Sequence, residues 1–216
     1  MSIDEKLIAV AENQEKVFEA GKKAEYDALW DELQNYGQPK SYANAFSFYL
    51  WNDKTYNPKY PFKIANCNAM FSGNTGITDT KVPLDFRGNK GQIYYVFENA
   101  KNLVTINKII LDETNQTFSR WFNNCTSLKN ITFEGTIGKN IDFQYSPLLS
   151  KASIENIVSC LSTTATGQTL TLSLTAVNNA FETSSGAADG STSQEWINLI
   201  TPKSNTYDGL WTITLV

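Results

Sequence analysis

A phenylalanine that recurs at a nearly constant interval constrains the fold of this chain more than any other feature of the sequence. Phe46, Phe71, Phe97 and Phe122 are separated by 25, 26 and 25 residues. Six residues after each of the last three, the chain again carries an apolar side chain, at Ile77, Leu103 and Leu128. A turn of about 25 residues cannot bury its own apolar face, so such turns stack on their neighbours. The interval therefore predicts a solenoid.

Short β-rich runs follow these apolar positions in the last three units. They occupy residues 81–86 (KVPLDF), 106–112 (INKIILD) and 131–135 (ITFEG). Stacked turns bring equivalent runs together along a solenoid. We expect the three runs to lie side by side in one sheet, about 4.8 Å apart.

Phe122, Cys125, Leu128 and Ile131 follow one another at three-residue steps, and the preceding unit has the same pattern with Ala100 in place of the cysteine. This pattern resembles the BspA-type leucine-rich repeat, whose units carry an apolar-Phe pair and then Cys, Leu and Ile at three-residue steps. The resemblance implies a short leucine-rich-repeat solenoid that binds a partner.

The resemblance covers roughly residues 65–145. The Phe71 unit departs from it at Asn74 and Thr80, and the Phe46 unit keeps only its first position. Chains with such a repeat, an acidic leading helix and a cap that ends in an aromatic strand are similar to proteins of tailed phages and prophages of gut Firmicutes. The resemblance therefore implies a virion-associated recognition or structural protein.

The N-terminal segment, residues 1–37, predicts one long helix over residues 2–36. Ser2 and Glu5 form a capping box at its start, and Gly37 gives its stop. Apolar residues at alternating four- and three-residue steps form a coiled-coil-like seam over residues 3–20. That seam favours an oligomerisation or docking handle, and the second half of the helix is expected to form a cap on the end of the body. The alternative is one amphipathic helix that packs along the body throughout.

The remaining chain divides into a leucine-rich-repeat body, residues 38–150, and a small α/β cap, residues 151–216. A turn and then a helix are expected within residues 146–162. A strand is expected over 169–174, with Leu170, Leu172 and Leu174 on one face. A short helix (TAVNNAFE) follows, then a loop containing GAADGS, then a helix that a Thr192/Glu195 capping box would start. The chain ends in the strand GLWTITLV, so the fold class is α/β.

Composition excludes several kinds of site. The chain contains no histidine, which removes Ser-His-Asp and Cys-His nucleophile sites and His-ligated zinc. The net charge of -4 disfavours binding to a nucleic-acid backbone. No apolar run approaches the ~20 residues of a membrane span. We expect no cofactor, no metal, no nucleic-acid partner and no membrane span.

The sequence MSIDEKLIAV at the N-terminus lacks the basic flank and apolar stretch of a signal peptide. We expect synthesis in the cytoplasm and a destination in the virion, with export by another route left open. Three cysteines, Cys67, Cys125 and Cys160, cannot all pair within one chain. They are expected to be reduced, small core residues.

Aromatic residues are concentrated in residues 42–62. Exposed tyrosine and tryptophan side chains supply large rigid contact areas with a polar tip. Tyr49, Trp51, Tyr56 and Tyr60 are therefore the candidate ligand-binding residues. The alternative is that they cover the open end of the solenoid.

The sequence favours a non-catalytic recognition or structural module, such as a tail or baseplate accessory that binds a protein or a cell-surface glycan. One alternative is a bacterial surface adhesin with the same repeat, which would need export. Another is a carbohydrate-active enzyme that uses two carboxylates, for which Asp112 and Glu113 or the flanking Asp79 and Asp85 are candidates. No paired-acid motif supports the enzyme, and no catalytic residue is predicted.

Overall fold

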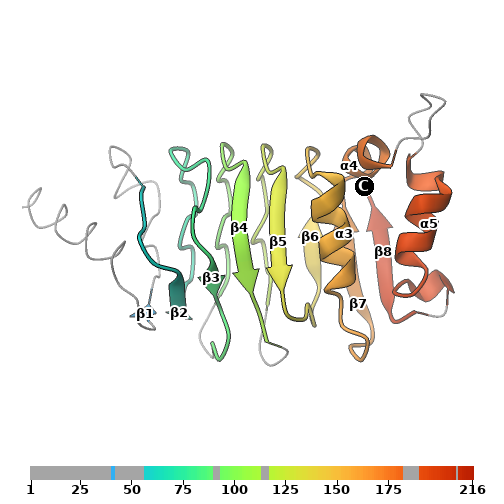
Figure 1. Ribbon diagram of the computed structural model, residues 1–216, viewed down its shortest axis with the longest axis horizontal. Helices are drawn as coiled ribbons and strands as arrows, with labels where there is room; N and C mark the ends of the chain where they lie inside the picture. Colours follow the sequence, from blue (N-terminus) through green and yellow to red (C-terminus); the bar gives the residue numbers. More distant parts are fainter. Residues whose placement is uncertain (1–39, 42–55, 90–92, 113–116, 182–189, 208) are drawn as a thin grey trace, which may run out of the picture.

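The computed structural model describes residues 40–41, 56–89, 93–112, 117–181, 190–207 and 209–216. These residues form an α/β structure in which every strand pairing is parallel (Figure 1). The predicted N-terminal helix, with its seam at residues 3–20, lies outside the described residues. Within them, no helix is long and apolar enough to cross a membrane.

A five-stranded sheet forms the front layer of the molecule in Figure 1, with its strands in chain order. The strands are β1 (Lys40–Ser41), β2 (Phe62–Asn66), β3 (Leu84–Asp85), β4 (Thr105–Ile110) and β5 (Asn130–Glu134). The prediction that the runs 81–86, 106–112 and 131–135 lie side by side is confirmed. The first run gives only a two-residue strand, because Pro83 has no N–H to donate to a ladder. Its carbonyl still accepts from the Phe62 N–H at 3.0 Å.

A three-stranded sheet lies behind the front layer. It contains β6 (Ile141–Phe143), β7 (Gln168–Leu172) and β8 (Trp211–Leu215) in that order. In Figure 1, β4 and β5 point down and β8 points up. Ile141, Leu170 and Ile213 share one register position across this rear sheet. The strands β7 and β8 were predicted, whereas β6 was not.

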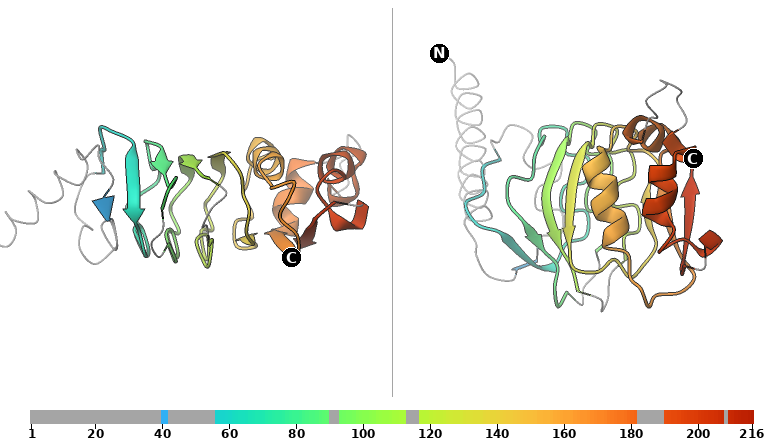
Figure 2. Two further views of the ribbon diagram at one scale, coloured as in Figure 1. Left: turned by 90° about the horizontal axis from the view of Figure 1, so that it is seen from below. Right: turned by 45° about the vertical axis from the view of Figure 1, so that its right-hand side comes forward.

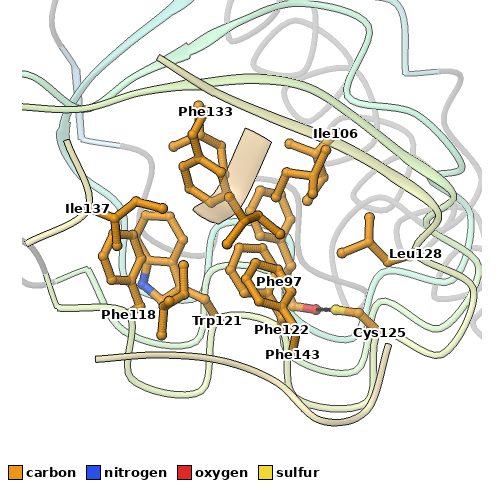
Figure 3. Packing of buried hydrophobic residues seen from close by; sticks show 14 of the residues in the cluster. Phe97, Ile106, Phe118, Trp121, Phe122, Cys125, Leu128, Phe133, Ile137 and Phe143 are labelled. Atoms are coloured by element: carbon orange, nitrogen blue, oxygen red, sulfur yellow. Dashed lines mark hydrogen bonds between the residues drawn. The ribbon is translucent and has the colours of Figure 1, made fainter. Parts of the chain in front are cut away.

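A column of phenylalanine rings fills the space between the two layers (Figure 3). Ring centroids are 5.4 Å apart for Phe71 and Phe97, 5.8 Å for Phe97 and Phe122, and 4.4 Å for Phe122 and Phe143. The rings are nearly parallel, and all four side chains are buried. Phe143 continues the column from β6, although it comes only 21 residues after Phe122. The predicted first member, Phe46, lies outside the described residues.

Backbone conformation recurs at the same interval as the phenylalanines. Each of the segments 69–73, 95–99 and 120–124 begins and ends with a left-handed residue whose φ lies between 54° and 68°. These residues are Ala69, Gly73, Tyr95, Asn99, Arg120 and Asn124. The segments also share backbone hydrogen bonds, from the N–H of Phe71 to Val96 O at 2.7 Å and from the N–H of Phe97 to Trp121 O at 3.1 Å.

The cysteines are all free thiols. Cys67 and Cys125 are buried, as predicted for small core residues, and Cys160 is half-buried at the end of a helix. The Cys125 thiol donates to Phe97 O at 3.2 Å, the contact drawn as a dashed line in Figure 3. Ala100, the residue equivalent to Cys125 in the preceding unit, is buried too.

Three helices complete the C-terminal region: α3 (Lys151–Ser159), α4 (Leu174–Ala180) and α5 (Gln194–Ile200). Figure 2 shows α3 and α5 following β5 along the front of the molecule. Short 3-10 turns occur at Gly190–Thr192 and Asn205–Tyr207. The turn and then helix predicted within residues 146–162 are confirmed, and Ser150 caps the start of α3 by accepting from the Ser153 N–H.

Two local predictions for the C-terminal region are wrong. Leu174 does not share the buried face of Leu170 and Leu172, because β7 ends at Leu172 and Leu174 begins α4 with 41% of its surface exposed. Thr192 does not cap α5. The capping residue is Ser193, whose hydroxyl accepts from the Trp196 N–H at 3.1 Å.

The helix α3 satisfies the free edge of β5. Ser153 Oγ accepts from the Ile131 N–H at 3.0 Å and donates to Lys129 O at 3.1 Å. Asn156 makes the corresponding pair of bonds with Phe133. Because these two residues are three apart on a helix, both side chains reach the strand from one face. The front sheet therefore ends at β5 without an exposed row of backbone groups.

Candidate functional site

The aromatic residues predicted to bind a ligand do not form one surface among the described residues. Tyr60 is 53% exposed, but Tyr56 is only 7% exposed. The Tyr56 hydroxyl donates to Thr80 O at 2.9 Å, and its ring lies edge-on to Phe71. Tyr56 is therefore a core residue, which corrects its assignment as a contact residue. Tyr49 and Trp51 lie outside the described residues.

The described carboxylates of the enzyme alternative, Asp79, Asp85 and Asp112, each accept a backbone hydrogen bond. Asp85 forms an ion pair with Arg87 at 2.7 Å, and Asp112 Oδ2 accepts from the Gly88 N–H at 2.6 Å. The hydrogen bond from Arg87 is the main reason that the pKa of Asp85 is lowered. The Asp79 carboxylate accepts from the Lys81 N–H at 2.7 Å. Glu113 lies outside the described residues.

A hollow lies on the outer side of the rear sheet, beside β6 and β7. A groove of about 580 Å³ is lined by residues 117–120, by residues 139–142 and by Gln168, Thr169 and Thr171 of β7. A smaller hollow of about 350 Å³ shares Arg120 and Asp142 with it and extends to Asn123, Gln144 and Tyr145. We refer to the two together as the rear groove.

Arg120 stands at the junction of the two hollows. Its Nη2 lies 2.5 Å from Glu98 Oε1, and its guanidinium lies 5.5 Å from the centroid of the Tyr95 ring. Asn123 Nδ2 donates to the same Glu98 oxygen at 3.1 Å. These contacts hold the guanidinium in place and neutralise its charge, although its side chain remains 58% exposed.

Asp142 points outward from β6, between the buried side chains of Ile141 and Phe143. Its Oδ1 accepts from the Gln144 N–H at 2.8 Å, and its Oδ2 accepts from Gln144 Nε2 at 2.9 Å. In the rear sheet, Asp142 is in register with Thr171. The alternation of the strand thus places a carboxylate and a hydroxyl next to each other on the outer face.

Amide side chains fix the other side of the groove. Gln168 Oε1 accepts from the Asn140 N–H at 3.0 Å, and Asn140 Oδ1 accepts from the Thr169 N–H at 2.8 Å. Gln168 Nε2 donates to Thr166 O at 3.1 Å. These reciprocal bonds cross from the start of β6 to the start of β7. They orient the polar side chains before any ligand arrives, which lowers the entropic cost of binding.

The residues of the rear groove were not among those singled out in the sequence. One signal was present, because the alternation in QTLTL (168–172) places Thr169 and Thr171 opposite the buried Leu170 and Leu172. For β6 no periodicity is detectable in three residues. Residues 117–120 lie near β6 and β7 only in the folded chain. No local sequence pattern indicates that these segments are neighbours.

Comparison with known proteins gives no relative. No family model, no curated protein and no solved structure matches this chain.

Proposed function

We propose that this chain is a non-catalytic recognition protein whose body is a short leucine-rich-repeat solenoid of the BspA type. The observation that carries the proposal is the coincidence of two intervals. The buried rings of Phe71, Phe97 and Phe122 are stacked at steps of 26 and 25 residues, and the left-handed backbone positions recur at the same steps. In a solenoid each turn contacts its neighbours in an equivalent way.

The cap region supports the same architecture. Solenoids need ends that cover the last turn. Here α3 occupies the edge of β5, and Phe143 extends the ring column by one further member. Residues 151–216 would then form the C-terminal cap of the solenoid.

Recognition rather than catalysis is supported by the chemistry of the rear groove. Glycoside hydrolysis by side chains requires two carboxyl groups. Among the described residues that line the groove, Asp142 is the single carboxylate. The other polar side chains there are amides, hydroxyls, Arg120 and Lys139, which suit binding.

The biological setting that we propose is a phage or prophage virion, with the chain as a tail or baseplate accessory that binds a protein or a cell-surface glycan. The resemblance of the residue pattern supports this setting. A bacterial surface adhesin is the second candidate, since the same repeat would serve it equally. Neighbouring tail, holin and lysin genes would support the virion, whereas a sortase and secretion context would support the adhesin.

Affinity capture tests the proposal. The full chain is immobilised and exposed to envelope fractions of gut Firmicutes and to virion lysates, and bound material is identified by mass spectrometry and sugar analysis. We expect a saturable partner that free protein displaces. Capture of nothing displaceable from either source would overturn the recognition function.

A further inference from the structure

The shape of the rear groove suits an extended ligand. Its volume of about 580 Å³ lies within the ~300–1,000 Å³ of ordinary ligand sites. Its lining comes from three separate segments, and the smaller hollow continues it past Arg120 toward Tyr145. A ligand that follows this path would cross β7 and β6 and then reach residues 117–123.

The lining lacks what an apolar ligand or a peptide needs. Ligand pockets are generally lined by hydrophobic and aromatic side chains. The apolar residues of the larger hollow, Phe118 and Ile141, are 3% and 2% exposed and so offer almost no surface. Extended peptides are held by an open strand edge together with pockets for alternate side chains. β6 is an edge strand of the rear sheet, but the described lining has no apolar pockets for alternate side chains of a peptide.

Hydrogen bonding in the groove suits a polyhydroxyl compound. Amide and hydroxyl side chains both donate and accept, as sugar hydroxyl groups do. Such groups line the larger hollow at Asn140, Gln168, Thr169 and Thr171, and the smaller hollow at Asn123 and Gln144. Their orientation is fixed by the bonds within and between β6 and β7.

Charge in the groove is balanced. The two cations are Arg120 and Lys139, and Asp142 is the carboxylate among the lining residues described. Glu98, which is paired with Arg120 at 2.5 Å, supplies the second negative charge. Recognition of a carboxylate, sulfate or phosphate generally uses a guanidinium that can offer its fork to the anion. The Arg120 guanidinium already contacts a carboxylate, so a neutral ligand fits better.

Tyr145 provides an aromatic surface at the end of the smaller hollow. Its side chain is 45% exposed. A tyrosine ring combines an apolar face with a polar tip, and the C–H face of a sugar ring can lie against it.

We propose that the rear groove binds a neutral oligosaccharide chain, with Thr171 and Asp142 bonding to its hydroxyl groups and Tyr145 contacting one sugar face. This inference rests on the proposed recognition function and narrows it to one ligand class and one surface. It moves the contact surface away from the aromatic residues 49–60.

A glycan array followed by calorimetry tests the site. The full chain is applied to neutral oligosaccharides of glucose, galactose, mannose and N-acetylglucosamine, and on the same array to sulfated, uronic-acid and sialylated glycans. The best neutral oligosaccharide is then titrated into the wild type and the Thr171→Val and Tyr145→Ala variants. We expect neutral glycans to bind, and each variant to bind about fivefold to tenfold more weakly, the effect of one lost contact.

Thr132→Val is the matched control. Thr132 is an exposed residue in the middle of β5, in the front layer. Valine keeps the β-branched shape of threonine both at Thr132 in β5 and at Thr171 in β7. This variant should bind as the wild type does. Circular dichroism and the thermal midpoint establish that each variant is folded.

The outcomes separate the inference from the proposed function. Binding to anionic glycans alone would overturn the ligand class. Binding to neutral glycans that Thr171→Val and Tyr145→Ala leave unchanged would overturn the groove and retain the recognition function. An array without any binding would overturn the inference, while displaceable capture of a protein partner would still support the recognition function.

Discussion

Asn156 contacts the backbone of Phe133 with both ends of its amide group. Asn156 Oδ1 accepts from the Phe133 N–H at 2.6 Å, and Asn156 Nδ2 donates to Phe133 O at 3.2 Å. An asparagine on α3 thereby provides the hydrogen bonds that a further strand would give. Edge strands with free backbone groups are sites of aggregation, and a covering helix is one of the ways to protect them.

Asn156→Ala should destabilise the chain by about 1–3 kcal/mol, because it leaves the part-buried N–H of Phe133 without its acceptor. The Phe133 carbonyl also loses a donor and keeps only the Cys160 thiol, at 3.5 Å. Chemical denaturation measures the free energy of unfolding. Asn179→Ala is the control, since Asn179 is an exposed asparagine in α4. Equal effects of the two substitutions would show that Asn156 does not act as a strand partner.

Phe122→Ala should cost about 3–5 kcal/mol, the range for removing a buried aromatic ring. Phe122 lies between Phe97 and Phe143 in the ring column, so its loss leaves a cavity with a ring on each side. Tyr60→Ala, at an exposed position, should change stability by less than about 0.5 kcal/mol. If Phe122→Ala does not change the denaturation midpoint, the stacked ring column is contradicted.

How much of this fold was predictable differs from residue to residue. Phe71, Phe97 and Phe122 could be assigned to the core because their spacing is constant. Phe143 could not, because it follows Phe122 after 21 residues, and the shorter step arises where the chain passes into β6. The constant interval indicates which phenylalanines lie next to one another, and it carries no information about a ring that follows after a shorter step.

The candidate site was predictable to a smaller extent. Composition suggests that a tyrosine such as Tyr56 is a contact residue. In the structure its hydroxyl donates to Thr80 O and its ring packs against Phe71, so the side chain is buried. The groove brings together Asp142 and Arg120, which are 22 residues apart in the chain. No local pattern marks such a meeting.

Acidification should remove a small stabilisation supplied by Asp85. The pKa of this carboxyl is lowered by the Arg87 hydrogen bond, so its contribution is complete above the unfolded pKa of about 3.9 and is lost as the pH falls through the folded pKa. Asp85→Asn should therefore lower the thermal midpoint near neutral pH and make no difference at about pH 2. In the Arg87→Gln background, Asp85→Asn should lower the thermal midpoint near neutral pH by a smaller amount. A difference that grows on acidification would contradict the ion pair.

Alkylation should distinguish the three thiols. Burial raises the pKa of Cys125 to about 12 and that of Cys67 as well, which keeps both as inert thiols. Cys160 is half-buried, so iodoacetamide at about pH 8 should modify it first. Mass spectrometry of peptides from the native protein gives the order. Earlier labelling of Cys125 would show that the column around Phe97 is open in solution.

Binding without turnover is the central claim, and co-sedimentation with envelope from the proposed hosts tests it most directly. The full chain is incubated with insoluble envelope of gut Firmicutes, and both the sedimented protein and the reducing sugar released into the supernatant are measured. The account predicts saturable sedimentation that Tyr145→Ala weakens, with no more reducing sugar than in the protein-free sample. Release of reducing sugar that Asp142→Asn abolishes would contradict it.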